Sequence, residues 1–109
     1  MSERDRKSEQ LQHLQRAVTG FKSGIEKLVA NQRTLLPTGP YGETFNRLLD
    51  TAKKLMPDVD SAIWPPKVEI GVIGGQPLCT VRYPELLSYA EMILNQIGED
   101  DPLSYIGRG

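Results

Sequence analysis

The sequence predicts an α+β protein in which two helices, a β-hairpin and a third helix follow one another along the chain, an ααββα order. Three observations predict this class. Apolar residues recur with heptad spacing from Leu11 onward, the pair Gly74-Gly75 separates two apolar runs, and an amphipathic segment begins at Pro84. Helices and strands that are grouped in blocks, and do not strictly alternate, are typical of the α+β class.

The first helix is predicted from a heptad seam, in which apolar residues fall at alternating steps of three and four. One set of seam positions holds branched residues and the other mostly Leu, a combination that favours a two-stranded parallel coiled coil. The first set is Leu11, Val18, Ile25 and Gln32, and the second set is Leu14, Phe21, Leu28 and Leu35.

Two features weaken the case for a free-standing coiled coil. Gly20 and Gly24 each cost about 1 kcal/mol in a helix interior, and positions beside the seam include Ala17 and Val29, where charged residues would normally pair. We therefore expect the helix to contact both its own domain and a second copy of the chain, in a homodimer. The alternative is an ordinary amphipathic helix of a monomer. The predicted oligomer interface consists of Leu11, Leu14, Val18, Phe21, Ile25 and Leu28.

A second helix is expected over about residues 43–56, after a stretch with two prolines and two glycines that ends the first helix. Residues 58–66 then form a linker in which Pro65 and Pro66 favour an extended chain. Trp64 is expected to fill the core, and the alternative is an exposed proline-containing ligand for an aromatic groove. The apolar face of the second helix consists of Phe45, Leu48, Leu49, Ala52, Leu55 and Met56.

The hairpin is predicted from Gly74-Gly75, because both central positions of a two-residue hairpin turn need positive φ. The resulting pairing gathers apolar side chains on one face of the hairpin. Because Pro77 lies on the second strand, that strand is expected at a sheet edge, and the outer edge of the first strand is open to another subunit. The glycines do not match a nucleotide-binding loop. The expected pairs are Ile73 with Gln76, Val72 with Pro77, Ile70 with Cys79 and Val68 with Val81.

The third helix is expected from Tyr83 to Gly98, with Pro84 in its first turn and Gly98 at its exit. Its apolar face consists of Leu86, Leu87, Ala90, Ile93, Leu94 and Ile97. The acidic tail is either a frayed terminus or a docking peptide. The expected organisation is an N-terminal helical arm with the heptad seam (1–36), a small α+β unit (37–98) and the acidic tail (99–109).

Composition excludes several classes of protein. The chain of 109 residues is 39% hydrophobic and 25% charged, as expected for a soluble globular domain. No apolar run approaches the roughly 20 residues that span a bilayer, and the polar N-terminus lacks the apolar core of a signal peptide. A single cysteine, Cys79, leaves no internal disulfide, so we expect a cytoplasmic protein without a membrane partner.

No catalytic, cofactor-binding or metal-ligating set emerges from the sequence. His13 falls off the seam in solvent and Cys79 falls on the apolar hairpin face, so no Cys–His dyad is expected. Asp58 and Asp60 begin like a calcium loop, but the residues after them lack the required oxygen ligands and glycine. Both aspartates are therefore interpreted as turn and capping residues.

Charge is unevenly spread, with a net charge of +4 over residues 1–54 and −5 over residues 55–109. The leading hypothesis is a non-enzymatic, homo-oligomeric protein–protein interaction module, such as an adaptor, chaperone-like factor or small structural component. It would assemble through its N-terminal helix and hold an unidentified protein partner. One alternative is a small dimeric nucleic-acid-associated protein that uses the basic faces of the first two helices, and a second is an enzyme or enzyme subunit with an unrecognised site. The nucleic-acid contacts would come from Arg16, Lys22, Lys27, Arg33, Arg47, Lys53 and Lys54.

Overall fold

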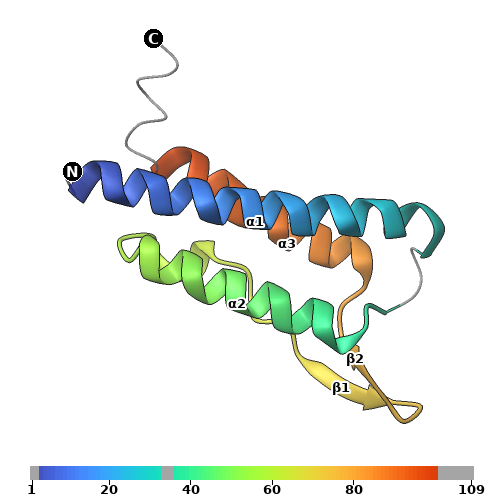
Figure 1. The fold of residues 1–109 in the computed structure, drawn as a ribbon. Helices are drawn as coiled ribbons and strands as arrows, with labels where there is room; N and C mark the ends of the chain where they lie inside the picture. Colours follow the sequence, from blue (N-terminus) through green and yellow to red (C-terminus); the bar gives the residue numbers. More distant parts are fainter. Residues whose placement is uncertain (1–2, 33–35, 101–109) are drawn as a thin grey trace.

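A computed structural model of the protein describes residues 3–32 and 36–100, and this part contains three α-helices and one two-stranded antiparallel sheet (Figure 1). The predicted α+β class is confirmed, with the predicted order of helix, helix, hairpin and helix. The helices are α1 (Glu3–Gln32), α2 (Gly39–Leu55) and α3 (Tyr83–Asp100), the strands are β1 (Ile70–Ile73) and β2 (Gln76–Cys79), and a 3₁₀ turn spans Ser61–Ile63.

The long helix α1 extends along the molecule, and α2 and α3 both return beside it (Figure 1). The hairpin lies next to the start of α2. The first turn of α1 and the last turn of α3 lie together at the opposite end of the molecule (Figure 1). The hairpin is thus supported by helix on one side only, and it projects from one end of the bundle.

The core is built from the heptad positions of α1 and the apolar faces of α2 and α3. Ile25 of α1, Phe45 of α2 and Leu86 of α3 are fully buried members of one cluster. Steps of three and four residues keep such side chains on one face of each helix, so the three faces meet. The helix α1 therefore shares its core with the rest of the described chain.

The start of α2 differs from the prediction, because the helix begins at Gly39, about four residues earlier than expected. Pro40 has the fixed φ that suits a first helical turn, and Thr38 before it is extended. Gly42 lies inside the helix, where an added Cβ would be only 2.8 Å from Cys79 Sγ. These residues therefore start a helix that packs closely on the hairpin, and they do not form a separate break.

The hairpin has the predicted register, with Ile70 opposite Cys79 and the turn at the expected place. Gly74 and Gly75 have φ values of 62° and 81°. These values match the type I′ turn, whose two central residues both need positive φ. The glycine pair therefore joins two strands, as predicted.

The third helix is confirmed, although α3 continues through Gly98 to Asp100. The prediction that Gly98 ends the helix is wrong, because Gly98 keeps a negative φ and does not form a left-handed cap. Residues 101–109 of the predicted tail lie outside the described residues.

Two predictions for the linker before β1 are confirmed, the core position of Trp64 and the capping role of Asp60. Trp64 is 7% exposed and belongs to the core cluster. Asp60 caps the 3₁₀ turn, since its Oδ1 accepts a hydrogen bond from the Ala62 N–H at 2.9 Å. Within the described residues, no helix combines the length and the apolar character needed to cross a bilayer.

Candidate interaction surface

The oligomer interface predicted on α1 is mostly buried inside the chain. The four most buried members, each at most 4% exposed, are Leu11, Leu14, Val18 and Ile25. Phe21 and Leu28 are half-buried against the same cluster, and the ring centroid of Phe21 lies 6.2 Å from that of Phe45. A second copy would have to displace α2 or α3 to reach the buried members. Packing within the chain accounts for the heptad spacing, and contact with a second copy through these residues stays a prediction.

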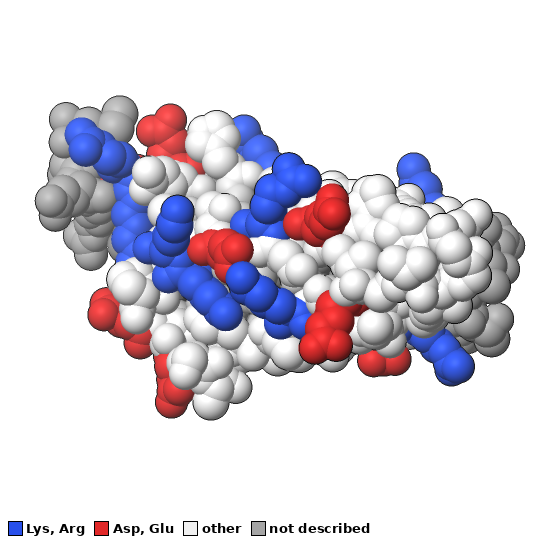
Figure 2. Space-filling view, turned by 90° about the horizontal axis from the view of Figure 1, so that it is seen from below, with Lys and Arg blue, Asp and Glu red and all other residues white. Residues whose placement is uncertain are grey.

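The hairpin end of the molecule carries exposed apolar side chains. Val72 is 77% exposed, Ile73 is 48% exposed and Ile70 is 36% exposed. Residues 70–81 contain no charged residue, and the end of the molecule that bears the hairpin is largely white in Figure 2. We call Ile70, Val72 and Ile73 the hairpin patch.

The outer edge of β1 has open backbone groups beside the hairpin patch. In an antiparallel pair, alternate residues direct their N–H and C=O toward the partner strand and away from it. The Thr80 N–H donates to the Glu69 carbonyl at 3.0 Å, so the backbone groups of Glu69 face β2. By the same alternation, the backbone N–H and C=O groups of Ile70 and Val72 both point away from β2. No described residue bonds to the outward groups of Ile70 and Val72.

The same edge is covered at Val68, two residues before Ile70, by the side chain of Asn46 of α2. Its Oδ1 accepts a hydrogen bond from the Val68 N–H at 2.8 Å, and its Nδ2 donates to the Val68 carbonyl at 2.9 Å. The side-chain amide therefore takes the place of a neighbouring strand at Val68. The open stretch of the edge begins at Ile70.

The outer edge of β2 is covered by the segment that precedes α2. The Cys79 N–H donates to the Pro37 carbonyl at 2.8 Å, and Thr38 forms an isolated β-bridge with Leu78. Natural proteins protect exposed strand edges with prolines, charges or covering segments. The edge of β1 over residues 70–72 has no protection of this kind from the described part of the chain.

The basic residues proposed for nucleic-acid contact differ in their surroundings. Lys22 is paired with Glu91 of α3 at an N–O distance of 3.3 Å, and Arg33 lies outside the described residues. Over the face shown in Figure 2, Lys and Arg side chains are interspersed with Asp and Glu. Contact with nucleic acid through these residues stays a prediction. The other members, all exposed, are Arg16, Lys27, Arg47, Lys53 and Lys54.

The groups with potential chemical reactivity lie apart. The His13 side chain is exposed on α1, with Nε2 3.9 Å from Glu9 Oε1. Cys79 is fully buried, and burial raises the pKa of its thiol, an effect that a hydrogen bond with the Gly42 backbone partly opposes. Within residues 3–32 and 36–100, no group of three His, Cys, Asp or Glu side chains could hold a metal ion.

Gly42 and Asn46 both position the hairpin, but the sequence around them does not predict this role. Gly42 stands in a stretch rich in proline and glycine, which suggests a break between helices. Asn46 is a single polar residue next to Phe45 on a predicted amphipathic helix. Only their four-residue spacing, which puts both on one helix face, indicates a site of close approach.

The chain has no match among protein-family models, curated proteins or solved structures. The fold and the hairpin patch are therefore interpreted from their own geometry and chemistry. The open edge of β1 is the most distinctive feature of this surface.

Proposed function

We propose that the protein is a non-enzymatic, homo-oligomeric interaction module that assembles by pairing β1 with β1 of a second copy. The observation that carries the proposal is the open backbone edge at residues 70–72 beside the exposed hairpin patch. An unprotected edge of this kind is a template for another strand. A second copy is the favoured partner because residues 70–81 carry no charge, so two identical segments meet without repulsion.

The open groups fit an antiparallel pairing about a two-fold axis at Gly71. In that register Ile70 of each copy lies opposite Val72 of the other, and each such pair exchanges both of its backbone hydrogen bonds. Asn46 already occupies Val68, so the pairing ends at Ile70. The product is a four-stranded sheet in the order β2–β1–β1–β2, which is more stable than the marginal isolated hairpin.

We therefore favour dimer formation through β1 over dimer formation through the N-terminal helix α1. The seam of α1 is covered by the chain's own helices, whereas Val72 is 77% exposed. Burying Ile70 and Val72 of both copies beside the two-fold axis would remove apolar surface from water, which favours association by roughly 25 cal/mol per Å².

The variant Val72→Lys tests this proposal, because it adds a charge at the most exposed position of the hairpin patch and leaves the core unchanged. For the wild-type chain we expect light scattering to give twice the monomer mass of 12.2 kDa, and for Val72→Lys the monomer mass. Gln76→Lys places the same charge at an exposed position of β2 and serves as the matched control, with the mass of the wild type expected.

A wild-type chain that stays monomeric at every concentration would overturn the proposal. So would a Val72→Lys variant that keeps the wild-type mass. Circular dichroism of both variants should match that of the wild type, which shows that any change in mass is not caused by unfolding.

A further inference from the structure

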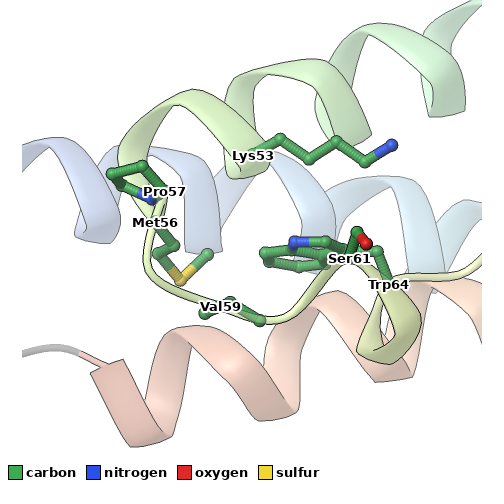
Figure 3. A pocket seen from close by; sticks show the side chains of 6 residues that line it. All are labelled: Lys53, Met56, Pro57, Val59, Ser61 and Trp64. Atoms are coloured by element: carbon green, nitrogen blue, oxygen red, sulfur yellow. The ribbon is translucent and has the colours of Figure 1, made fainter.

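A pocket lies between the C-terminal end of α2 and the linker that follows it, at the opposite end of α2 from the hairpin (Figures 1 and 3). Its volume is about 220 Å³. At about 30 Å³ for each water in the liquid, this volume matches a ligand of roughly seven non-hydrogen atoms. The lining residues are Lys53, Met56, Pro57, Val59, Ser61 and Trp64.

The pocket is lined by a buried tryptophan whose indole N–H has no acceptor among the described residues. Trp64 is 7% exposed, and no described residue accepts a hydrogen bond from its indole N–H. In Figure 3 the indole nitrogen lies on the edge of the ring that faces the Lys53 side chain. A buried Trp N–H usually finds a partner, because an unmade hydrogen bond in the interior is costly. The indole N–H is therefore available to a ligand that supplies an acceptor.

A positive charge lies above the same pocket. The Lys53 side chain passes over the pocket in Figure 3, and it forms no ion pair with a described carboxylate. No acidic residue lines the pocket. The polar side chains of the lining, Lys53, Ser61 and Trp64, can all donate hydrogen bonds, and only the Ser61 hydroxyl can also accept them.

The remaining walls of the pocket are apolar and suit a hydrocarbon group. Met56, Pro57, Val59 and the face of the Trp64 ring present apolar surface. The pocket also lies at the C-terminal end of α2, where the negative end of the helix dipole opposes an anion, and it opposes a monoanion less than a dianion. These features fit a carboxylate attached to a short hydrocarbon group and disfavour a phosphate dianion.

We propose that this pocket binds a small carboxylate with a hydrocarbon chain, with the carboxylate oxygens accepting hydrogen bonds from the Trp64 indole N–H and the Lys53 ammonium. The hydrocarbon lies against Met56 and Val59. Such a group is present in a free short-chain acid and also at the C-terminus of a peptide that ends in an apolar residue. The proposal does not depend on assembly through β1.

Fluorescence tests the proposal directly, because Trp64 is the only tryptophan of the chain. Titration of the 109-residue chain with pentanoate should give a saturable change in fluorescence, and pentanamide, which lacks the charge, should bind about tenfold more weakly. Lys53→Gln should weaken pentanoate binding about tenfold. Lys54→Gln changes an adjacent cation that does not line the pocket and should leave the affinity unchanged.

A second variant tests the indole donor itself. Trp64→Phe keeps an aromatic ring in the core but removes the N–H, and binding can then be followed by NMR through the Met56 methyl group. We expect pentanoate affinity to fall about tenfold, and an unchanged affinity would overturn the assignment of the indole as a donor.

Two peptides distinguish the sources of the carboxylate. One ends in a free leucine carboxylate, and the other is the same peptide with an amidated C-terminus. Saturable binding of the free-carboxylate peptide alone identifies a protein C-terminus as the ligand, and binding of pentanoate alone identifies a free acid. The proposal is overturned if neither probe binds saturably, if the amides bind as well as the acids, or if Lys54→Gln weakens binding as much as Lys53→Gln.

Discussion

Gly42 shows how one residue sets the distance between two elements. A Cβ at this position would lie 2.8 Å from Cys79 Sγ and 3.1 Å from Val68 Cγ1. Because glycine has no side chain, α2 can approach the hairpin closely enough for Asn46, one turn later, to bond to the Val68 backbone. The closed part of the β1 edge therefore depends on Gly42.

Gly42→Ala should destabilise the protein, because overpacking typically costs about 1–3 kcal/mol. Alanine regains about 1 kcal/mol of helix propensity over glycine, so we expect a net loss of about 1 kcal/mol in the free energy of unfolding, measured by urea denaturation. Gly24→Ala is the matched control, since no heavy atom lies within 4 Å of an added Cβ there. It should stabilise by about 1 kcal/mol. Equal stabilisation by both variants would contradict the close approach of α2.

Residues with a strong local preference could be predicted from the sequence, whereas residues that act across elements could not. Gly74 and Gly75 specify their turn by backbone preference alone, and Asp60 caps the turn that follows it. The role of Asn46 depends on Val68, 22 residues away, and no local pattern contains that contact. The unmet N–H of Trp64 likewise depends on which residues surround the ring.

At the scale of the element, the seam of α1 shows the limit of a periodic pattern. Steps of three and four residues specify that one face of the helix is buried, and this expectation is confirmed for Leu11, Val18 and Ile25. The same spacing fits a partner helix from another chain or from the same chain. In this structure, α2 and α3 supply that partner.

Replacing Val18 and Ile25 together with Asp distinguishes these two arrangements. Both side chains are 0% exposed, so two unpaired buried carboxylates should abolish the native fold, which thermal unfolding followed by circular dichroism would show as loss of the cooperative transition. Gln15→Asp with Ser23→Asp is the control at exposed positions of α1 and should stay folded. If the buried double variant instead keeps a native spectrum and only loses oligomer mass, the seam joins two chains.

The hairpin illustrates what the sequence reveals about an element and what it leaves open. The register follows from Gly74-Gly75, and the proline of β2 predicts an edge strand. The protection of each edge is supplied by residues distant in sequence, Pro37 on β2 and Asn46 on β1. Only the folded arrangement therefore identifies residues 70–72 as the open stretch.

At the scale of the whole molecule, assembly and stability are linked. Any association that requires the folded chain stabilises it by mass action, so the unfolding temperature of the wild type should rise with protein concentration. A tenfold increase in concentration corresponds to at most about 1.4 kcal/mol, or a few degrees for a chain of this size. Scanning calorimetry of Val72→Lys should give one unfolding temperature at all concentrations. A wild-type transition that does not depend on concentration would contradict assembly of the folded chain.

The placement of the first turn of α1 and the last turn of α3 has a practical consequence for this assembly. The first turn of α1 and the last turn of α3 lie together, remote from the hairpin (Figure 1). Reporter domains fused beyond these turns would point outward from the distal tips of a paired particle and leave the central sheet unobstructed. Energy transfer between two such reporters would be inefficient, whereas dyes placed next to the glycine turn would be brought close together.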